Sequence, residues 1–544
     1  MADLAKAYRA SESQTGVFVA SVFILFIAAL SLVVFVSPTV ALAAALGAVF
    51  VAIALARPLF ILYFLAVYLP FEPFLLKFVP DDVYVYARFF SEVLIYLLAL
   101  SVLARIFTGK IRAKRTPIGI FFALFLLVLL SSALINIVPP TIAVLGTRQI
   151  IRFILVFFIV VHIAPKRSYM RSLTIAMFSI VLLQAVIGIA QALFGGAIDA
   201  LLLPSQARVL GDIQLTSGVV QFWDPGTRVF ATMGRYDQLG TFLAFFLIFA
   251  AAMVYELRGK SVPRNELWLL FIFGIPALVL TYSRSSWFGF LIAFLFIAII
   301  MKRDKRVLAA SLICAAFIGV YLLYSGIVVG KLFESPQQTV AERFLEAFSY
   351  ERWRGEYYGL GRLYWIVETV GTVVPASPIF GFGPGQYGAG AASALRNSKV
   401  YESLGLPFGV YGTEGYIDNN WLSLWGESGT LGLAFYIAMF AVMFRYANRL
   451  YETSKDPFTR ALALGYMGAM LAVSLNAFLA TFLEVRTLAF YFWMYSGFIV
   501  VLGEGEKERA RSQVPSDKSP AFAEASAWQA RSKIHDQSSK IQDT

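Results

Sequence analysis

Several arginines lie at the ends of strongly apolar segments, where a lone charge is costly and could do chemistry. Arg284, for example, separates two apolar runs in the stretch LTYSRSSWFGF. The others of this kind are Arg148, Arg152, Arg228, Arg235 and Arg362. A guanidinium is always charged and offers a planar fork of donors that fits phosphate oxygens. Several converging guanidiniums would bind a diphosphate, although each one alone could instead snorkel to a membrane surface or pair with a nearby carboxylate.

Carboxylates that could accept a proton lie in and just before the stretch YIDNNWLSLWGESGTLGLAFY, residues 416–436. Asp418 precedes an apolar segment, Glu427 lies within it, and Glu414 comes shortly before both. A carboxylate at the mouth of a site can act as a general base. Aspartate is also a favoured helix N-cap, and on chemistry alone the cap is the stronger interpretation of Asp418. Glu427 could equally form a buried ion pair with one of the arginines.

Aromatic residues in the preceding segment could present surfaces to a sugar. Trp365 and Tyr387 are the main candidates, and Asn419 is a third residue expected to contact sugar. Aromatic side chains are also common at membrane interfaces, where they need no such role.

The elements that must position these residues are membrane helices. Of the 544 residues, 59% are hydrophobic and only 14% are charged, too few charges to cover a soluble protein of this size. Apolar segments long enough to cross a bilayer recur along the chain, which predicts an all-α polytopic membrane protein with about 12 to 14 transmembrane helices. The first of them, residues 16–36, is interpreted as a retained helix and not a signal peptide.

Lysines and arginines are concentrated in alternate short loops, and the positive-inside rule then places both termini in the cytoplasm. One medium and one long extracytoplasmic loop follow, at residues 195–237 and 326–420. Long loops usually carry function. The predicted organisation is N-terminal helices at 1–140, central helices at 141–325, the large loop at 326–420, C-terminal helices at 421–503 and a disordered cytoplasmic tail at 504–544.

The remaining composition excludes several classes of site. The net charge of +12 is scattered between apolar runs and accompanies no nucleic-acid motif, so no nucleic-acid partner is expected. The two histidines are too few and too far apart for a zinc site, and the single cysteine excludes a disulfide framework. The sequence therefore predicts neither a metal nor a cofactor.

Four blocks of the chain together resemble the O-antigen ligase and O-antigen polymerase superfamily of bacterial envelope polysaccharide enzymes. The resemblance rests on their order and spacing and spans roughly residues 140–440. The blocks are RVFATMGRYDQLGTFLAFF, LTYSRSSWFGFL, GRLYWIVETV followed by PIFGFGPGQYG, and IDNNWLSLWGESGTLGLAFY.

The resemblance implies an all-helical C-type glycosyltransferase in which outside arginines hold a lipid diphosphate and a loop residue activates the acceptor hydroxyl. Arg228, Arg284 and Arg362 match arginines of the family's motifs, with Arg235 a neighbour of the first. Ligases of the family commonly carry His-Asn where this chain has Asp418-Asn419. That departure favours the polymerase-type members.

The expected function is the transfer or polymerisation of an undecaprenyl-diphosphate-linked oligosaccharide onto an acceptor glycan, inverting and metal-independent, at the outer face of the bacterial inner membrane. Ligation to lipid A core and protein O-glycosylation are alternatives with the same donor. A transporter of lipid-linked sugars or small anions is a second alternative. The expected partners are the lipid-linked donor, the acceptor glycan and membrane lipids, and a chain-length regulator is left open.

Overall fold

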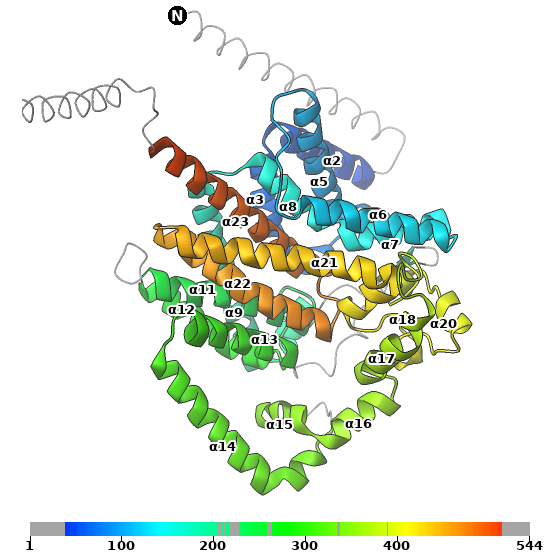
Figure 1. Ribbon diagram of the computed structural model, residues 1–544, viewed down its shortest axis with the longest axis vertical. Coiled ribbons are helices and arrows are strands. Elements are labelled where there is room, and N and C mark those ends of the chain that lie inside the picture. Colours follow the sequence, from blue (N-terminus) through cyan, green and yellow to red (C-terminus); the bar gives the residue numbers. More distant parts are fainter. Residues whose placement is uncertain are drawn as a thin grey trace, which may run out of the picture.

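The computed structural model describes residues 38–203, 208–210, 213–216, 228–257, 264–333, 338–388 and 390–513. The predicted helix at 16–36 lies outside them. Apart from a short antiparallel hairpin of β1 (Arg208–Leu210) and β2 (Ile213–Thr216), the described chain is helical. The predicted all-α class is confirmed, and the protein is a polytopic membrane protein (Figure 1).

Eight of the described helices are long and apolar enough to cross a membrane. They are α5 (Asp81–Phe107), α9 (Arg167–Phe194), α11 (Tyr236–Glu256), α13 (Arg284–Leu295) with η2 (Phe296–Met301), α14 (Lys305–Gly330), α21 (Asn420–Thr453), α22 (Pro457–Leu479) and α23 (Arg486–Gln513). Helices α7 (Pro140–Ile151) and α8 (Ile154–Ile163) are bent by 55° at their junction, and the pair would make a ninth span if it crosses the membrane as one.

The number of long spans is below the expected 12 to 14 because several apolar segments form shorter helices. These are α2 (Pro38–Ala56), α3 (Pro58–Tyr68), α6 (Gly119–Ile135) and α12 (Arg264–Leu280), whose apolar parts are 10–17 residues long. The short α4 (Glu72–Leu76) and α10 (Gly196–Leu202) lie in the connections. Helix α23 continues to Gln513, nine residues beyond the predicted start of the tail, because Glu, Lys, Arg and Gln are good helix formers.

The centre of the bundle consists of α11, α22 and α23. The most apolar 18-residue stretches of these helices are 83%, 72% and 83% buried inside the protein. Helices α13 and α21 pack against α22. In contrast, α14 leaves the bundle at an angle (Figure 1). Only 6% of its most apolar 18-residue stretch is buried.

The large loop folds into short helices at one end of the bundle (Figure 1). They are α15 (Val340–Leu345), η3 (Glu346–Phe348), α16 (Tyr350–Tyr358), α17 (Arg362–Glu368), η4 (Thr369–Val373), α18 (Val374–Ala376), α19 (Gly390–Ala394), α20 (Lys399–Ser403) and η5 (Val410–Gly412). Trp365, Tyr387 and Tyr401 form a small core of their own there. The loop is therefore a folded unit that holds its polar residues in fixed positions.

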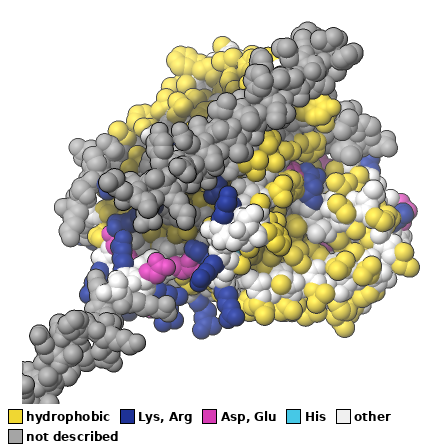
Figure 2. Space-filling model, turned by 90° about the horizontal axis from the view of Figure 1, so that it is seen from above, with side chains coloured by type: hydrophobic (Ala, Val, Ile, Leu, Met, Phe, Trp, Pro, Cys, Tyr) yellow, Lys and Arg dark blue, Asp and Glu magenta, His cyan; other side chains and the backbone are white. Residues whose placement is uncertain are grey.

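Basic side chains gather at the opposite end, where they pair with carboxylates: Lys302 and Arg460 with Glu256, and Arg167 with Asp456. Figure 2 shows Lys and Arg concentrated on one side and apolar side chains spread over the other. This distribution is what the positive-inside rule predicts if the basic end faces the cytoplasm.

Candidate functional site

The start of α21 fixes the position of Asp418. The helix is capped by Asn419, whose Oδ1 accepts a hydrogen bond of 3.0 Å from the backbone N–H of Leu422. The cap role considered for Asp418 is therefore wrong, because the neighbouring asparagine fills it. Asp418 instead adopts a φ of +50°, an uncommon conformation that aspartate tolerates better than most residues. Its carboxylate, half-buried, is available for other partners.

Asp418 is the centre of a group of polar residues from four parts of the chain. Its Oδ2 lies 3.1 Å from Nη2 of Arg362, the first residue of α17. Arg235, just before α11, forms a two-pronged ion pair with Asp237 at 3.0 and 2.9 Å. The guanidinium of Arg228 lies over the ring of Tyr236, 4.4 Å from its centre. We call this set the Asp418 cluster: Arg228, Arg235, Tyr236, Asp237, Arg362, Glu414 and Asp418.

Electrostatic coupling shows that these groups act on one another. Burial opposes the charge of Arg362, but the carboxylates of Asp418 and Glu356 outweigh it and raise the pKa of the guanidinium. The carboxylate of Asp237 raises the pKa of Arg235 against the effect of burial, and Asp418 adds to it. Burial and the nearby Asp418 raise the pKa of Glu414, so Glu414 binds a proton more readily than a free glutamate.

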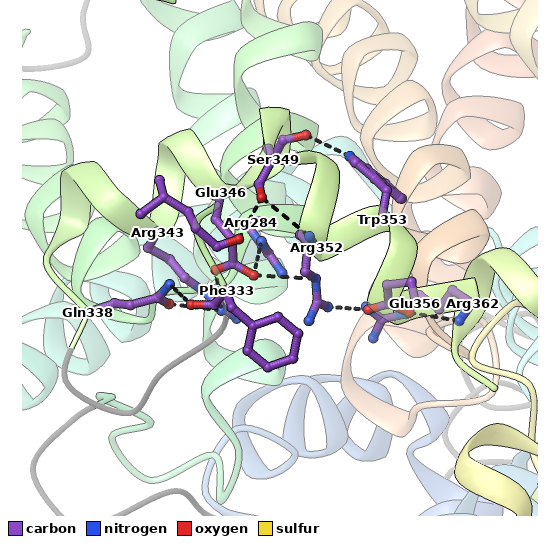
Figure 3. A network of polar contacts seen from close by, with 12 residues as sticks. Arg284, Phe333, Gln338, Arg343, Glu346, Ser349, Arg352, Trp353, Glu356 and Arg362 are labelled. Atoms are coloured by element: carbon purple, nitrogen blue, oxygen red, sulfur yellow. Dashed lines mark hydrogen bonds and ion pairs between the residues drawn. The ribbon is translucent and has the colours of Figure 1, made fainter. Parts of the chain in front are cut away.

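Arg284 belongs to a second group, shown in Figure 3, which is organised around one carboxylate. Glu346 is completely buried, and its Oε1 lies 3.0 Å from Nη1 of Arg284. Its carboxylate also forms ion pairs with Nη1 of Arg343 at 3.1 Å and with Nε of Arg352 at 3.3 Å. The turn before α13 is thereby tied to the large loop. The Glu346 network consists of Arg284, Arg343, Glu346, Arg352 and Glu356.

The Glu346 network continues to the Asp418 cluster. Arg352 forms an ion pair with Glu356 one helical turn further along α16. The other oxygen of Glu356 accepts a hydrogen bond of 2.8 Å from the backbone N–H of Arg362. These contacts connect Arg284 to Arg362 (Figure 3), whose guanidinium pairs with Asp418. The two connecting glutamates, Glu346 and Glu356, were not predicted as site residues, although each lies three or four residues from an arginine, the spacing of helical ion pairs.

Arg148 and Arg152 do not share partners with the other candidate arginines. Both bind Glu92 of α5, Arg148 with Nη2 at 2.6 Å and Arg152 with Nη1 at 3.1 Å. Arg152 also donates from Nη2 to the carbonyl of Glu484 at 2.8 Å. The six arginines predicted to hold a diphosphate thus fall into three groups, of which the Glu346 network and the Asp418 cluster are connected through Glu356.

Glu427 and the aromatic candidates lie inside the protein. The Oε1 of Glu427 accepts a hydrogen bond of 3.2 Å from the backbone N–H of Tyr387, and its carbonyl accepts one of 2.9 Å from Gly383. Trp365 and Tyr387 are fully buried, and Asn419 is 2% exposed. The structure therefore places these side chains where they support the loop and the start of α21, and not on a surface that a sugar could reach.

The comparisons with known proteins bear on the part of the chain that holds these groups. The family model described as O-antigen ligase matches residues 269–437, which include the Glu346 network, Arg362 and Asp418. No curated protein matches the chain. Among the described residues, no three His, Cys, Asp or Glu side chains are grouped so as to hold a metal ion.

Proposed function

Since the chain carries an O-antigen ligase domain and belongs to the O-antigen ligase and polymerase family of glycosyltransferases, we propose that it transfers an undecaprenyl-diphosphate-linked oligosaccharide to an acceptor glycan. The reaction would take place at the outer face of the bacterial inner membrane, the side of the large loop. The observation that supports this most is the meeting of a carboxylate, Asp418, with Arg362 and Arg235 at the start of α21.

In the proposed reaction, a hydroxyl oxygen of the acceptor attacks C1 of the sugar on the lipid diphosphate. The bond between C1 and the phosphate oxygen breaks with inversion, and its electron pair leaves with undecaprenyl diphosphate. The hydroxyl proton passes to the Asp418 carboxylate, which acts as general base. Arg228, Arg235 and Arg362 stabilise the negative charge that develops on the leaving oxygen.

Arg284 acts in this scheme through Glu346 and the large loop, as a positioning residue. Its guanidinium is 17% exposed and is held by a carboxylate that is completely buried. Glu414, whose pKa is raised, is a second candidate for the proton acceptor at the same mouth.

Asp418, in the place where ligases commonly have histidine, favours polymerisation over ligation to lipid A core or protein O-glycosylation. The acceptor is then a second glycan of the same kind. A transporter of lipid-linked sugars is the remaining alternative. The two hypotheses can be separated by experiment, because transport requires two compartments and glycan transfer does not.

The test is glycan extension by the purified protein in detergent, with undecaprenyl-diphosphate-linked oligosaccharide as substrate. Product length on a gel and release of undecaprenyl diphosphate are measured together. Asp418→Asn is expected to lower kcat by about 10²–10⁴-fold and Arg362→Ala by about 10²–10³-fold. The matched controls are Glu351→Gln and Arg354→Ala, an exposed pair on α16 that is 3.7 Å apart, and they should retain activity.

Two results would contradict the proposal. Asp418→Asn with activity within about twofold of the wild type would remove Asp418 as the base. A wild-type protein that extends no glycan in detergent, yet moves the lipid-linked sugar across vesicle membranes, would favour the transporter. Transfer to lipid A core in place of a second repeat unit would identify a ligase.

A further inference from the structure

Another group of arginines lies where α4, α5, α7 and the start of α23 meet, away from the partners of Asp418. We call it the Glu92 cluster. Its charged members are Glu72, Arg88, Glu92, Arg148, Arg152, Glu484 and Arg486. Of these arginines, only Arg148 and Arg152 were predicted from the sequence to bind a ligand. Arg88 and Arg486 were missed because each lies inside or beside an apolar segment without a recognisable motif.

Most charges in the Glu92 cluster are paired. Glu92, 3% exposed, binds Arg148 and Arg152 and accepts a hydrogen bond of 2.7 Å from Tyr96. Glu72, also 3% exposed, lies 2.9 Å from Nη1 of Arg486. These pairs offset the cost of burying the charges of the five groups in a membrane protein.

Arg88 is the exception. It precedes Glu92 by one helical turn of α5, so both side chains lie on the same, inward face. Among the residues that the structure describes, Arg88 has no hydrogen-bond or ion-pair partner. It is within electrostatic reach of Arg486, Glu72 and Arg152. The Nε of Arg152, which is buried, also lacks a hydrogen-bond partner in the described part of the chain.

The charges of the Glu92 cluster do not balance. The arginines Arg88, Arg148, Arg152 and Arg486 face the carboxylates of Glu72 and Glu92. Even with the third carboxylate, Glu484, counted as charged, the four guanidiniums outnumber the three carboxylates. An excess of guanidinium charge inside a membrane protein is unfavourable unless an anion compensates for it.

We propose that Arg88, Arg152 and Arg486 form a second anion-binding site, for a phosphate group carried by a lipid. Guanidiniums bind phosphate oxygens through paired, charge-assisted hydrogen bonds, and Arg88 and Nε of Arg152 have donors to offer. The charges are attached to membrane helices, which suits a phosphate whose hydrocarbon chain lies in the bilayer.

The site is also connected to the start of α21. Glu484, whose carbonyl holds Arg152, accepts hydrogen bonds from Gln149 at 3.1 Å, from the backbone N–H of Gly390 at 2.9 Å and from Asn420 at 3.5 Å. Asn420 is two residues from Asp418. If the phosphate belongs to a lipid-linked acceptor, this site would hold the acceptor while the Asp418 cluster holds the donor. That use rests on the proposed function, whereas binding itself does not.

The experiment counts lipids bound to the purified full-length protein by native mass spectrometry in neutral detergent, with undecaprenyl diphosphate as the probe. The key variant is Arg88→Gln, because it breaks no contact that the structure shows. We expect the affinity of one binding event to fall at least about tenfold, since a charge-assisted hydrogen bond contributes about that factor or more. Arg88→Lys should restore part of it, and the melting temperature of Arg88→Gln should not fall.

The outcomes separate this proposal from the proposed function. Two bound lipids in the wild type, one in Arg88→Gln and one in Arg362→Ala would support both. One lipid in the wild type, lost in Arg88→Gln but kept in Arg362→Ala, would support the anion site alone. Unchanged binding by Arg88→Gln would overturn it. Phosphatidylglycerol, with phosphatidylcholine as its control, is the second probe: Arg88-dependent binding of it identifies a membrane phospholipid as the source, and its failure to bind identifies the lipid-linked glycan carrier.

Discussion

Replacing Glu346 by glutamine tests whether the large loop is held to the membrane helices by one buried carboxylate. The substitution keeps the size of the side chain and removes its charge. Glu346 is completely buried, and its partners Arg284, Arg343 and Arg352 are only 17%, 6% and 12% exposed. Three guanidiniums would then face one another without the anion that separates them.

The expected decrease in the free energy of unfolding is large for a single substitution. Removing one partner of a buried ion pair costs about 3–5 kcal/mol, because the other charge remains buried and uncompensated. The pair of Arg362 and Asp418 is different, since these side chains are 39% and 29% exposed. Such a pair contributes about 0–1 kcal/mol. Glu346→Gln should therefore destabilise the protein, whereas Asp418→Asn should lower kcat with little change in stability.

The assay is unfolding of the purified protein in mixed micelles, followed by tryptophan fluorescence as the fraction of denaturing detergent is raised. Glu351→Gln is the control, because this carboxylate lies on the neighbouring α16 and is 44% exposed. A Glu346→Gln protein as stable as this control would refute the reasoning about the Glu346 network. The double variant Arg284→Met/Glu346→Gln should be more stable than the sum of its single variants predicts, since the two residues interact directly.

Two further predictions concern the packing of the loop and the effect of pH. Gly426→Ala should lower the free energy of unfolding by about 1–3 kcal/mol, because a Cβ there would lie 2.0 Å from a ring carbon of Tyr387. Gly371→Ala is the control, since a Cβ there would have nothing within 4 Å, and it should be neutral in the same unfolding assay. Burial raises the pKa of Glu484 above its ordinary value of 4.5, so the folded state keeps a proton that the unfolded state has lost. Stability should fall as the pH rises from that value through the raised pKa, and Glu484→Gln should flatten this part of the profile of melting temperature against pH. Parallel profiles would contradict the assignment.

Hydropathy predicted the long membrane helices well, because their apolar residues follow one another without interruption. Two of these segments, α9 (Arg167–Phe194) and α22 (Pro457–Leu479), are each a single unbroken helix. It could not predict the break between α7 and α8, because the apolar character continues from one helix into the other. Hydropathy measures how long a segment stays apolar, and a bend of 55° changes the direction of the helix without changing that length.

The candidate site was predictable in its residue types but not in its grouping. Arg362 and Asp418 are 56 residues apart, and only the folded loop brings them to 3.1 Å. Likewise, the sequence gives no reason to assign Arg228 to one group and Arg152 to another. Glu346 was missed because a glutamate beside arginines on an amphipathic helix usually forms an exposed ion pair, and its complete burial depends on the turn that contributes Arg284.

The contrast between Arg284 and Arg88 shows why the pairing of an arginine matters more than its position in an apolar segment. The sequence indicates no obvious partner for either arginine, and a lone charge in either place would be unfavourable. The structure gives Arg284 the carboxylate of Glu346 at 3.0 Å, which accounts for its charge by the fold alone. It gives Arg88 two neighbouring arginines and a glutamate that already binds one of them. The fold thus explains Arg284 without a ligand, whereas the charge of Arg88 calls for an anion from outside the chain.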